Sequence, residues 1–319
     1  MDQIKVVMMR GRWTAWIDDL NAVSDRVTAV AAETDEDLMR EIVDADVVYG
    51  RLPREPFRIA NKLKWVQSIG VGFETMLYPE MIDSNVVITN TAGAFDSAMA
   101  EHALALILSF TRGIIFCERN RKGHLWQQDV PISQIDGQTA CVLGLGSIGR
   151  AIIDRLPALG VTVTAVDAQV TDPPDGVSKL YSPDQMLDAV AEADFVIVAL
   201  PLTDGTRGLI NADCFARMKD TGYLVNIARG PIVNQADLIN ALRAHQIAGA
   251  GMDVFEKEPL PEDSPLWEME NVVLTPHLGG RSEEGGPNMK NIFVENLKRY
   301  VEGKNLLNII DKQKGYLIQ

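Results

Sequence analysis

The glycine-rich turn Gly144-Leu-Gly-Ser-Ile-Gly149 is the sequence feature that most constrains the fold. Its glycines have the G-x-G-x-x-G spacing, in which the first allows a tight turn, the second lets backbone approach a pyrophosphate and the third lets a helix pack on a strand. The apolar segment 139–143 before the turn is typical of a short buried strand, and apolar residues recur with a helical period over 148–159. This context favours a dinucleotide-binding turn over a glycine turn in an unrelated strand–helix unit.

An acidic residue follows the turn where the same motif requires one. The predicted strand 161–166 ends in Asp167, about 20 residues beyond the glycines, where a carboxylate meets a ribose diol. The next residues, Ala168-Gln-Val170, include no arginine to receive a 2′-phosphate. Because a carboxylate repels a phosphate, the sequence predicts NAD(H) rather than NADP(H) as cofactor.

The overall charge and hydropathy narrow the class of partner. The 319 residues carry a net charge of −14, from 30 basic and 44 acidic side chains that are scattered along the chain. Such a surface repels phosphate backbones, so we expect no nucleic-acid partner. No apolar run reaches the roughly 18 residues of a membrane span, and the start of the sequence lacks the plan of a signal peptide. We therefore expect a cytoplasmic protein without membrane association.

Cysteine and histidine are sparse. Cys117, Cys141 and Cys214 lie far apart in apolar stretches without C-x-x-C spacing, and we interpret all three as buried thiols. His102 falls inside an apolar helical stretch, which favours a hydrogen-bonded core histidine. No cluster of His, Cys, Asp or Glu has metal-ligand spacing, so the sequence predicts no metal.

Strand and helix patterns alternate through both halves of the chain, which is typical of α/β proteins with parallel, helix-covered sheets. In the first hundred residues we expect strands at 4–9, 27–31, 45–49, 63–69 and 86–89 and a helix at 36–43. After Asp167 we expect strands at 195–200, 223–227, 248–253 and 272–275 and helices at 184–191, 212–218 and 235–244. The sequence therefore predicts two doubly wound domains.

Two further helices set the domain limits. The segment from Glu101 to about Asn120 is too apolar for a surface helix, and we interpret it as one connecting helix buried between domains or subunits. We expect a final helix at 288–301 to return with the tail to the first domain. The predicted limits are 1–97 with 286–319 for that domain, and 98–285 for the dinucleotide-binding domain.

Three polar residues follow predicted strands of the second domain, where ligands of open parallel sheets bind. They are Arg229, Glu258 and His277. Singly, each has an ordinary structural reading: a solvated charge, a surface carboxylate before proline, and a turn residue after proline. Downstream of one dinucleotide turn, the three together indicate a reaction site.

A base, a carboxylate and a cation are the groups that hydride transfer at an alcohol carbon requires. The guanidinium of Arg229 would anchor a substrate carboxylate with a bidentate fork. His277 would take the hydroxyl proton as hydride leaves for the nicotinamide, and return it in the reverse direction. Glu258 would orient the imidazole and support its charged form.

The order of motifs along the chain resembles that of the D-isomer-specific 2-hydroxyacid dehydrogenases. The motifs that carry the resemblance are Gly70-Val-Gly72, Ala100-Glu-His-Ala-Leu-Ala-Leu106, the glycine turn with Asp167, Leu200-Pro-Leu-Thr203, Thr206-Arg-Gly-Leu-Ile210, Asn226-Ile-Ala-Arg-Gly230, Asp253-Val-Phe-Glu-Lys-Glu-Pro259 and Thr275-Pro-His-Leu-Gly-Gly280. They span nearly the whole chain. The resemblance implies a Rossmann NAD-binding domain, a flavodoxin-like substrate (catalytic) domain and a cleft between them.

The resemblance also implies residue roles. Arg229, Glu258 and His277 would be catalytic, and the amides of Val71 and Gly72 would hold the substrate carboxylate. Asp253 would hold the nicotinamide carboxamide. The implied cofactor-binding residues are Gly144, Gly146, Ser147, Ile148, Gly149, Asp167, Pro201, Thr206, Ala228 and Asp253. The family further implies a homodimer joined around the connecting helix, with Trp126 reaching the partner's active site.

The substrate side departs from the family pattern. Glu74 stands where the family's glycine loop usually continues to aspartate, and Phe95 stands where asparagine is frequent. Arg51, after the third strand, is a second candidate contact for an anionic substrate. These positions leave the identity of the 2-hydroxy or 2-oxo acid open.

Two other functions remain as alternatives. An NAD(H)-sensing binding protein of the co-repressor type would keep the same fold and polar residues, although we find no basic arm for partner recruitment. A 3-phosphoglycerate dehydrogenase is disfavoured, since we expect no room after the last helix for the regulatory domain often attached there.

Overall fold

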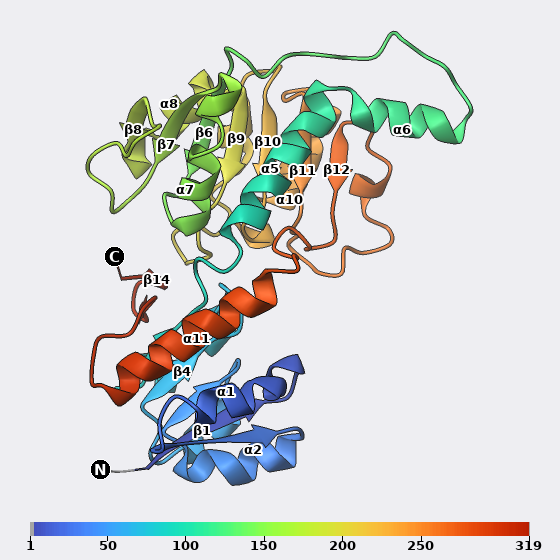
Figure 1. The fold of residues 1–319 in the computed structure, drawn as a ribbon. Helices are drawn as coiled ribbons and strands as arrows, with labels where there is room; N and C mark the ends of the chain where they lie inside the picture. The colour runs from blue at the N-terminus through green and yellow to red at the C-terminus, as the bar shows by residue number, and fades with distance from the viewer. Residues whose placement is uncertain (1–2, 319) are drawn as a thin grey trace. The chain divides into compact units, whose positions relative to one another are not determined.

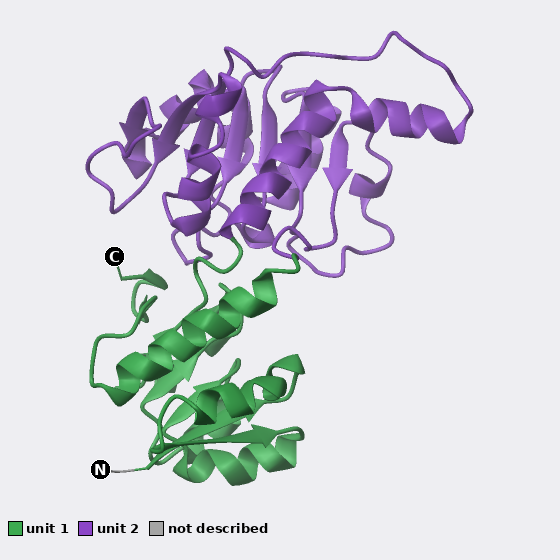
Figure 2. Ribbon diagram, viewed as in Figure 1, with its two compact units in different colours: residues 1–95, 282–319 green, residues 96–281 purple. Residues whose placement is uncertain are grey.

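The computed structural model describes residues 3–318, so the predicted domain limits at residues 1 and 319 lie outside the described range. The chain divides into two compact units (Figure 2). The first comprises Met1–Phe95 and Ser282–Gln319, and the second comprises Asp96–Arg281. The chain thus leaves the first unit after Phe95 and returns to it at Ser282.

The first unit is built on a five-stranded parallel sheet of order β2-β1-β3-β4-β5. Its strands are β1 Ile4–Met9, β2 Val27–Ala32, β3 Val47–Tyr49, β4 Trp65–Gln67 and β5 Val87–Thr89. All residues of β3 and β4 are buried, as expected of strands covered on both faces. The strand order is the flavodoxin-like one, which confirms the predicted class of this domain.

The helices of this unit come from both ends of the chain. They are α1 Ile17–Asn21, α2 Asp35–Glu41, α3 Arg54–Ile59, α4 Pro79–Asp83 and α11 Gly285–Val301, with 3-10 turns η1 Arg12–Trp16, η2 Ile42–Asp44 and η3 Glu74–Met76. The sequence does not predict α1, α3 or α4, because five or six residues are too few to show a helical period. α11 packs Phe293 against Trp65, with ring centroids 5.5 Å apart.

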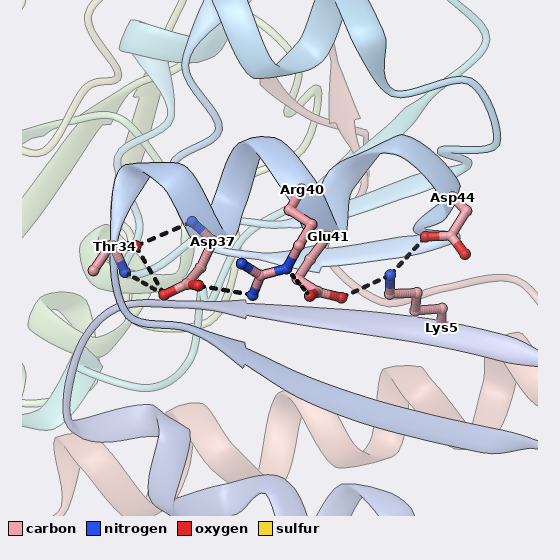
Figure 3. A network of polar contacts seen from close by, with 6 residues as sticks. All are labelled: Lys5, Thr34, Asp37, Arg40, Glu41 and Asp44. Carbon is pink, nitrogen blue, oxygen red and sulfur yellow. Dashed lines mark hydrogen bonds and ion pairs between the residues drawn. The ribbon is translucent and has the colours of Figure 1, made fainter.

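A capping box starts α2 and ion pairs fasten its far end (Figure 3). Thr34 Oγ1 accepts from the Asp37 amide at 3.0 Å, and the Asp37 carboxylate accepts from the Thr34 amide at 3.1 Å. Lys5 Nζ on β1 lies 2.9 Å from a carboxylate oxygen of Glu41. The capping box satisfies amides at the start of α2, and the ion pair links its last residue to β1.

The C-terminal tail is also tied to the first unit. It forms an antiparallel hairpin of β13 Ile310–Asp311 and β14 Tyr316–Leu317. Lys312 Nζ donates to the carbonyl oxygens of Met81 at 2.9 Å, Ser84 at 2.6 Å and Val86 at 2.9 Å. One side chain thereby joins the tail to the end of α4 and the start of β5.

The second unit is built on a seven-stranded parallel sheet of order β12-β11-β10-β9-β6-β7-β8. Its strands are β6 Thr139–Leu143, β7 Thr162–Val166, β8 Lys179–Tyr181, β9 Phe195–Val198, β10 Tyr223–Asn226, β11 Gly249–Met252 and β12 Val272–Leu274. This is the Rossmann order with one added strand, and the chain reverses its winding between β6 and β9. The short edge strand β8 is absent from the sequence-based expectation.

Helices accompany this sheet in the second unit, and α5 among them packs against β10, β11 and α7 (Figure 1). They are α5 Asp96–Thr111, α6 Ile114–Lys122, α7 Ser147–Ile153, α8 Met186–Glu192, α9 Ala212–Arg217 and α10 Gln235–Arg243, with 3-10 turns η4 Pro157–Leu159, η5 Pro183–Gln185, η6 Gly230–Ile232 and η7 Pro265–Trp267. Within 3–318, no single helix is long and apolar enough to cross a membrane.

The prediction of one continuous connecting helix is wrong. α5 and α6 are separate and bent by 68°, because Gly113 between them adopts a left-handed conformation with φ 65°. The helix after the bend, α6, has no buried residue. Cys117 on α6 is therefore exposed, which corrects its interpretation as a buried thiol, whereas Cys141 and Cys214 are buried.

Candidate active site

The glycine turn lies at the carboxyl end of β6, beside the point where the sheet reverses its winding. A Cβ on Gly149 would clash with the carbonyl oxygen of Gly144, so the close contact of helix on strand requires glycine. Gly144 has φ 100°, which only glycine adopts readily. Around Gly146, by contrast, nothing lies within 4 Å of a built Cβ. The turn thus leaves open backbone where a pyrophosphate approaches, which fits a dinucleotide.

Asp167 is fixed beside this turn by three backbone amides. Its Oδ2 accepts from the Leu145 amide at 2.7 Å, and its Oδ1 accepts from the amides of Gln169 at 2.7 Å and Val170 at 3.0 Å. The predicted acid therefore lies against the glycine turn, at the end of β7.

The other predicted cofactor residues have local hydrogen bonds. Ser147 Oγ donates to Asp96 Oδ1 at 3.0 Å. Thr206 Oγ1 donates to the carbonyl oxygen of Pro201 at 2.7 Å, and the Ala228 amide donates to Asn226 Oδ1 at 3.1 Å. Ile148, in the first turn of α7, is half-buried. These residues follow β6, β9 and β10, so they share the carboxyl edge of the sheet.

Arg229 follows β10 in a loop that packs on the loop after β11. Its Nη1 donates to the Ala228 carbonyl oxygen at 2.7 Å. A Cβ on Gly230 would clash with the backbone of Phe255, so the two loops touch through backbone and glycine is required between them. This contact places Arg229 beside the segment that leads to Glu258.

Glu258 and His277 form a direct pair. His277 Nδ1 lies 2.6 Å from Glu258 Oε2, and Glu258 Oε1 accepts from the Phe255 amide at 3.0 Å. The His277 side chain is 52% exposed, and its Nε2 has no hydrogen-bond partner within the described part of the chain. The pair therefore holds the ring by one nitrogen and leaves the other nitrogen open.

The backbone around His277 is held in an unusual conformation. His277 has φ 51°, a left-handed value that is strained for a residue with a Cβ. Its amide donates to the carbonyl oxygen of Asp253 at 2.8 Å. Non-glycine residues in this region cluster at functional sites, where the surrounding structure must hold them.

Asp253 supplies most of that hold. Its buried carboxylate accepts from Thr275 Oγ1 at 2.6 Å and from the amides of Leu278 at 2.9 Å and Gly279 at 3.0 Å. Burial raises the pKa of Asp253, but the neighbouring His102 and the hydrogen bonds from Thr275, Leu278 and Gly279 outweigh burial and leave its pKa below the ordinary value of 3.8. The carboxylate predicted to contact nicotinamide thus also organises the loop that carries His277.

His102 is part of this cluster although the sequence indicates only a core histidine. From α5, its Nε2 lies 2.9 Å from Thr275 Oγ1 and 3.4 Å from Asp253 Oδ1. The hydrogen-bonded position agrees with the prediction, but the partner Thr275 is 173 residues away along the chain. The only signal in the sequence is the need of a histidine in an apolar helix for a polar partner.

The predicted substrate residues of the first unit lie after β3 and β4. In the loop 70–72, the Thr91 amide donates to the Gly70 carbonyl oxygen at 3.1 Å, Asn90 Nδ2 donates to that of Val71 at 2.9 Å, and Ser68 Oγ donates to that of Gly72 at 3.0 Å. Since each amide points opposite to the preceding carbonyl, the amides of residues 71–73 face away from these partners. Within residues 3–318, these three amides donate no hydrogen bond.

The predicted site residues are divided between the two units. Glu258 is in contact with His277, and Arg229 lies on an adjoining loop, all in the second unit. Arg51 is exposed after β3, and it belongs to the first unit with the loop 70–72. Across residues 3–318, no group of three or more His, Cys, Asp or Glu side chains is arranged to hold a metal ion.

Comparisons with known proteins show which family this chain is similar to. The family model described as "D-isomer specific 2-hydroxyacid dehydrogenase, NAD binding domain" matches residues 104–279. A glyoxylate reductase of Thermofilum pendens is 32% identical over 289 residues, which cover 87% of this chain and 85% of that protein. A D-3-phosphoglycerate dehydrogenase of Archaeoglobus fulgidus is 34% identical over 86% of this chain, which spans 53% of that protein.

A solved structure extends the similarity to the whole fold. It is a D-isomer specific 2-hydroxyacid dehydrogenase of Xanthobacter autotrophicus in complex with NADPH. The match has a TM-score of 0.86 and 29% identity, covering 98% of this chain and 99% of that one. Both sheets therefore have counterparts in one known protein.

Proposed function

The chain belongs to the D-isomer-specific 2-hydroxyacid dehydrogenase family, and we propose that it interconverts a D-2-hydroxy acid and its 2-oxo acid with NAD(H). Family membership supports an NAD(P)-dependent oxidoreductase acting on 2-hydroxy and 2-oxo acids. The observation that carries the finer proposal is the 2.6 Å contact between His277 Nδ1 and Glu258. An imidazole held by a carboxylate, with its second nitrogen open, is suited to proton transfer.

In the proposed reaction, NAD(H) supplies or accepts the hydride. His277 Nε2 donates a proton to the carbonyl oxygen of the 2-oxo acid during reduction and removes it from the hydroxyl during oxidation. Glu258 keeps the ring oriented and stabilises the imidazolium. Arg229 binds the substrate carboxylate, together with the amides of Val71 and Gly72, and Arg51 offers a further positive charge. Residues 1–95 with 282–319 would act as the substrate domain, and residues 96–281 as the dinucleotide-binding domain.

We assign NAD(H) rather than NADP(H) from the surroundings of Asp167. Its carboxylate is held by the Leu145 amide of the glycine turn, and Ala168-Gln-Val170 offer no cation. The related Xanthobacter structure contains NADPH, so a direct comparison is required. We expect kcat/KM with NADH to exceed that with NADPH, and an equal or higher value with NADPH would refute the assignment.

A panel of 2-oxo acids tests the activity. NADH absorbance would be followed with glyoxylate, hydroxypyruvate, pyruvate, phenylpyruvate and a branched-chain 2-oxo acid, with glyoxylate tried first because a relative is a glyoxylate reductase. We expect NADH oxidation with at least one of them. NADH binding without turnover on any member would instead support the alternative, an NAD(H)-sensing binding protein.

We further propose a cytoplasmic homodimer. Large apolar side chains are exposed on α6 and the segment after it, namely Ile114, Leu125, Trp126 and Ile132. Trp126 is 93% exposed, and burial of such a ring against a second copy would remove that apolar surface from water. Light scattering of the wild-type protein and of Trp126→Ala would test the association.

A further inference from the structure

The protons in the His102 cluster can be assigned from its geometry. Thr275 Oγ1 lies between His102 Nε2, at 2.9 Å, and Asp253 Oδ1, at 2.6 Å. A hydroxyl has one proton to donate, and an ionised carboxylate can only accept. Thr275 must therefore donate to Asp253, and it must accept from His102. The Nε2 of His102 consequently carries a hydrogen.

This donor chain ends on the loop that carries the acid/base. Beyond Thr275, the same carboxylate of Asp253 binds the amides of Leu278 and Gly279, which flank His277 on its C-terminal side. The left-handed backbone of His277, with φ 51°, is strained, and neighbouring contacts must offset that strain. A donor chain that fixes both ends of the segment 275–279 supplies such contacts.

His102 also packs directly under the loop. A Cβ on Gly279 would lie 3.0 Å from His102 Cδ2 and 3.0 Å from Asp253 Oδ2, closer than most side chains tolerate. The His102 side chain is only 14% exposed, and Asp253 is 1% exposed. The ring therefore fills the space beneath residues 275–279 as well as donating to them, and the site belongs entirely to the second unit.

We propose that His102 is a positioning residue: its Nε2–H, through Thr275 and Asp253, holds the loop 275–279 so that His277 keeps its place against Glu258. The kinetic part of this proposal rests on the proposed dehydrogenase function. His102 contacts neither substrate nor cofactor in this role. Its loss should disturb the aim of His277, hence turnover, more than the binding of NADH.

Two substitutions at one position test the kinetic part. His102→Leu removes the donor, whereas the amide nitrogen of Gln in His102→Gln can occupy the place of Nε2. We expect kcat to fall about 10- to 100-fold in His102→Leu, as small misplacements of a catalytic group do, with the NADH dissociation constant within about twofold of wild type. We expect His102→Gln to recover most of kcat. His124→Gln, at an exposed histidine, serves as the matched control.

Equal losses in the Leu and Gln variants, or a His102→Leu enzyme with wild-type kcat, would overturn the proposal. A tenfold weaker binding of NADH with unchanged kcat would overturn it as well, since that result would place His102 in cofactor binding. If His102→Leu does not fold, the Gln variant and the measurement below still decide.

A spectroscopic measurement is independent of turnover. Long-range ¹H–¹⁵N spectra of protein labelled at its four histidines, assigned with His102→Gln, report which ring nitrogens carry hydrogen. We expect a protonated Nε2 at His102 in the wild type, and loss of that fixed state in Thr275→Val. An unprotonated Nε2 in the wild type would refute the inference even if the enzyme is active. A protonated Nε2 in a protein that reduces no 2-oxo acid would leave the hydrogen-bond chain intact and refute the proposed function alone.

Discussion

Two loops at the carboxyl ends of parallel strands are anchored in different ways. The loop 275–279 of the second unit is anchored to a buried carboxylate, Asp253, through a hydroxyl and two amides. The loop 70–72 of the first unit is anchored by neutral donors, the side chains of Asn90 and Ser68 and one backbone amide. In loop 275–279 the backbone amides point to the anchor, whereas in loop 70–72 the backbone carbonyls do.

The difference follows from what each loop presents. Loop 275–279 presents a side chain, His277, from a strained backbone, so it needs strong anchors on its amides. In the proposed site, loop 70–72 presents its own amides, which leaves its carbonyls for hydrogen bonds within the protein. Hydrogen bonds to a charged group contribute about 1.5–3 kcal/mol and neutral ones about 0.5–1.5 kcal/mol. We therefore expect substitutions around Asp253 to cost more than substitutions around Asn90.

The largest effect on activity should come from His277, the side chain that loop 275–279 presents. His277→Ala should lower kcat about 10²- to 10⁴-fold, the usual contribution of a general acid/base, while NADH still binds with wild-type affinity. Steady-state kinetics and NADH fluorescence titration would measure the two quantities. Turnover near the wild-type level would remove His277 from its role, and His245→Ala, at an exposed histidine, controls for loss of an unrelated imidazole.

The second-largest effect should come from Asp253, which anchors loop 275–279. Asp253→Asn places an amide NH₂ against donors that now face a carboxylate, so we expect the free energy of unfolding to fall by about 2–3 kcal/mol and kcat to fall with it. Urea unfolding and activity would be measured together. The exposed Asp213, whose side chain makes no hydrogen bond in the described chain, provides the control variant Asp213→Asn, which should match wild type. An equally stable Asp253→Asn enzyme would contradict the charged-anchor interpretation.

The same anchor predicts a pH dependence. The hydrogen bonds of Asp253 hold its pKa below the ordinary value of 3.8, so its stabilising contribution is complete above that value and is lost as pH falls through the lower pKa of the folded state. The stability difference between wild type and Asp253→Asn should therefore be constant near neutral pH and shrink in acid. A difference that grows as pH falls below about 4 would show the opposite shift.

Sequence patterns predict the positions of the proposed catalytic residues better than they predict the contacts that anchor the loops. Arg229, Glu258 and His277 follow strands whose apolar runs are visible locally, so their place at the sheet edge could be inferred from one short stretch each. The anchors join distant residues: His102 meets Thr275 only because α5 packs beside β11 and the loop after β12. No local period encodes that meeting.

The fold shows the same limit. The glycine turn and the strands predict two doubly wound domains correctly, because buried strands leave continuous apolar runs. The break at Gly113 could not be predicted, since an isolated glycine is tolerated inside a helical pattern and only the left-handed backbone ends the helix. The exposure of Cys117 depends on that break.

Among the neutral anchors, Asn90 should have the larger effect. Asn90→Ala removes the donor to the Val71 carbonyl and frees the peptide that carries the Gly72 amide. We expect KM for the 2-oxo acid to rise about fivefold, which corresponds to one neutral hydrogen bond of about 1 kcal/mol, with kcat nearly unchanged. Asn305→Ala, at an exposed asparagine, is the control. A loss confined to kcat would place Asn90 with the proton-transfer groups instead.

The smallest effect on KM should come from Ser68. Combining its substitution with that of Asn90 tests whether loop 70–72 moves as one body. Ser68→Ala removes the donor to the Gly72 carbonyl, and we expect KM to rise about twofold to threefold. Because Asn90 and Ser68 hold successive peptides of one loop, the second loss should cost less once the first has freed it. The double variant should therefore show a smaller rise in KM than the product of the single effects. A full product would mean that each peptide is held independently, and the two loops would then differ in cooperativity as well as in charge.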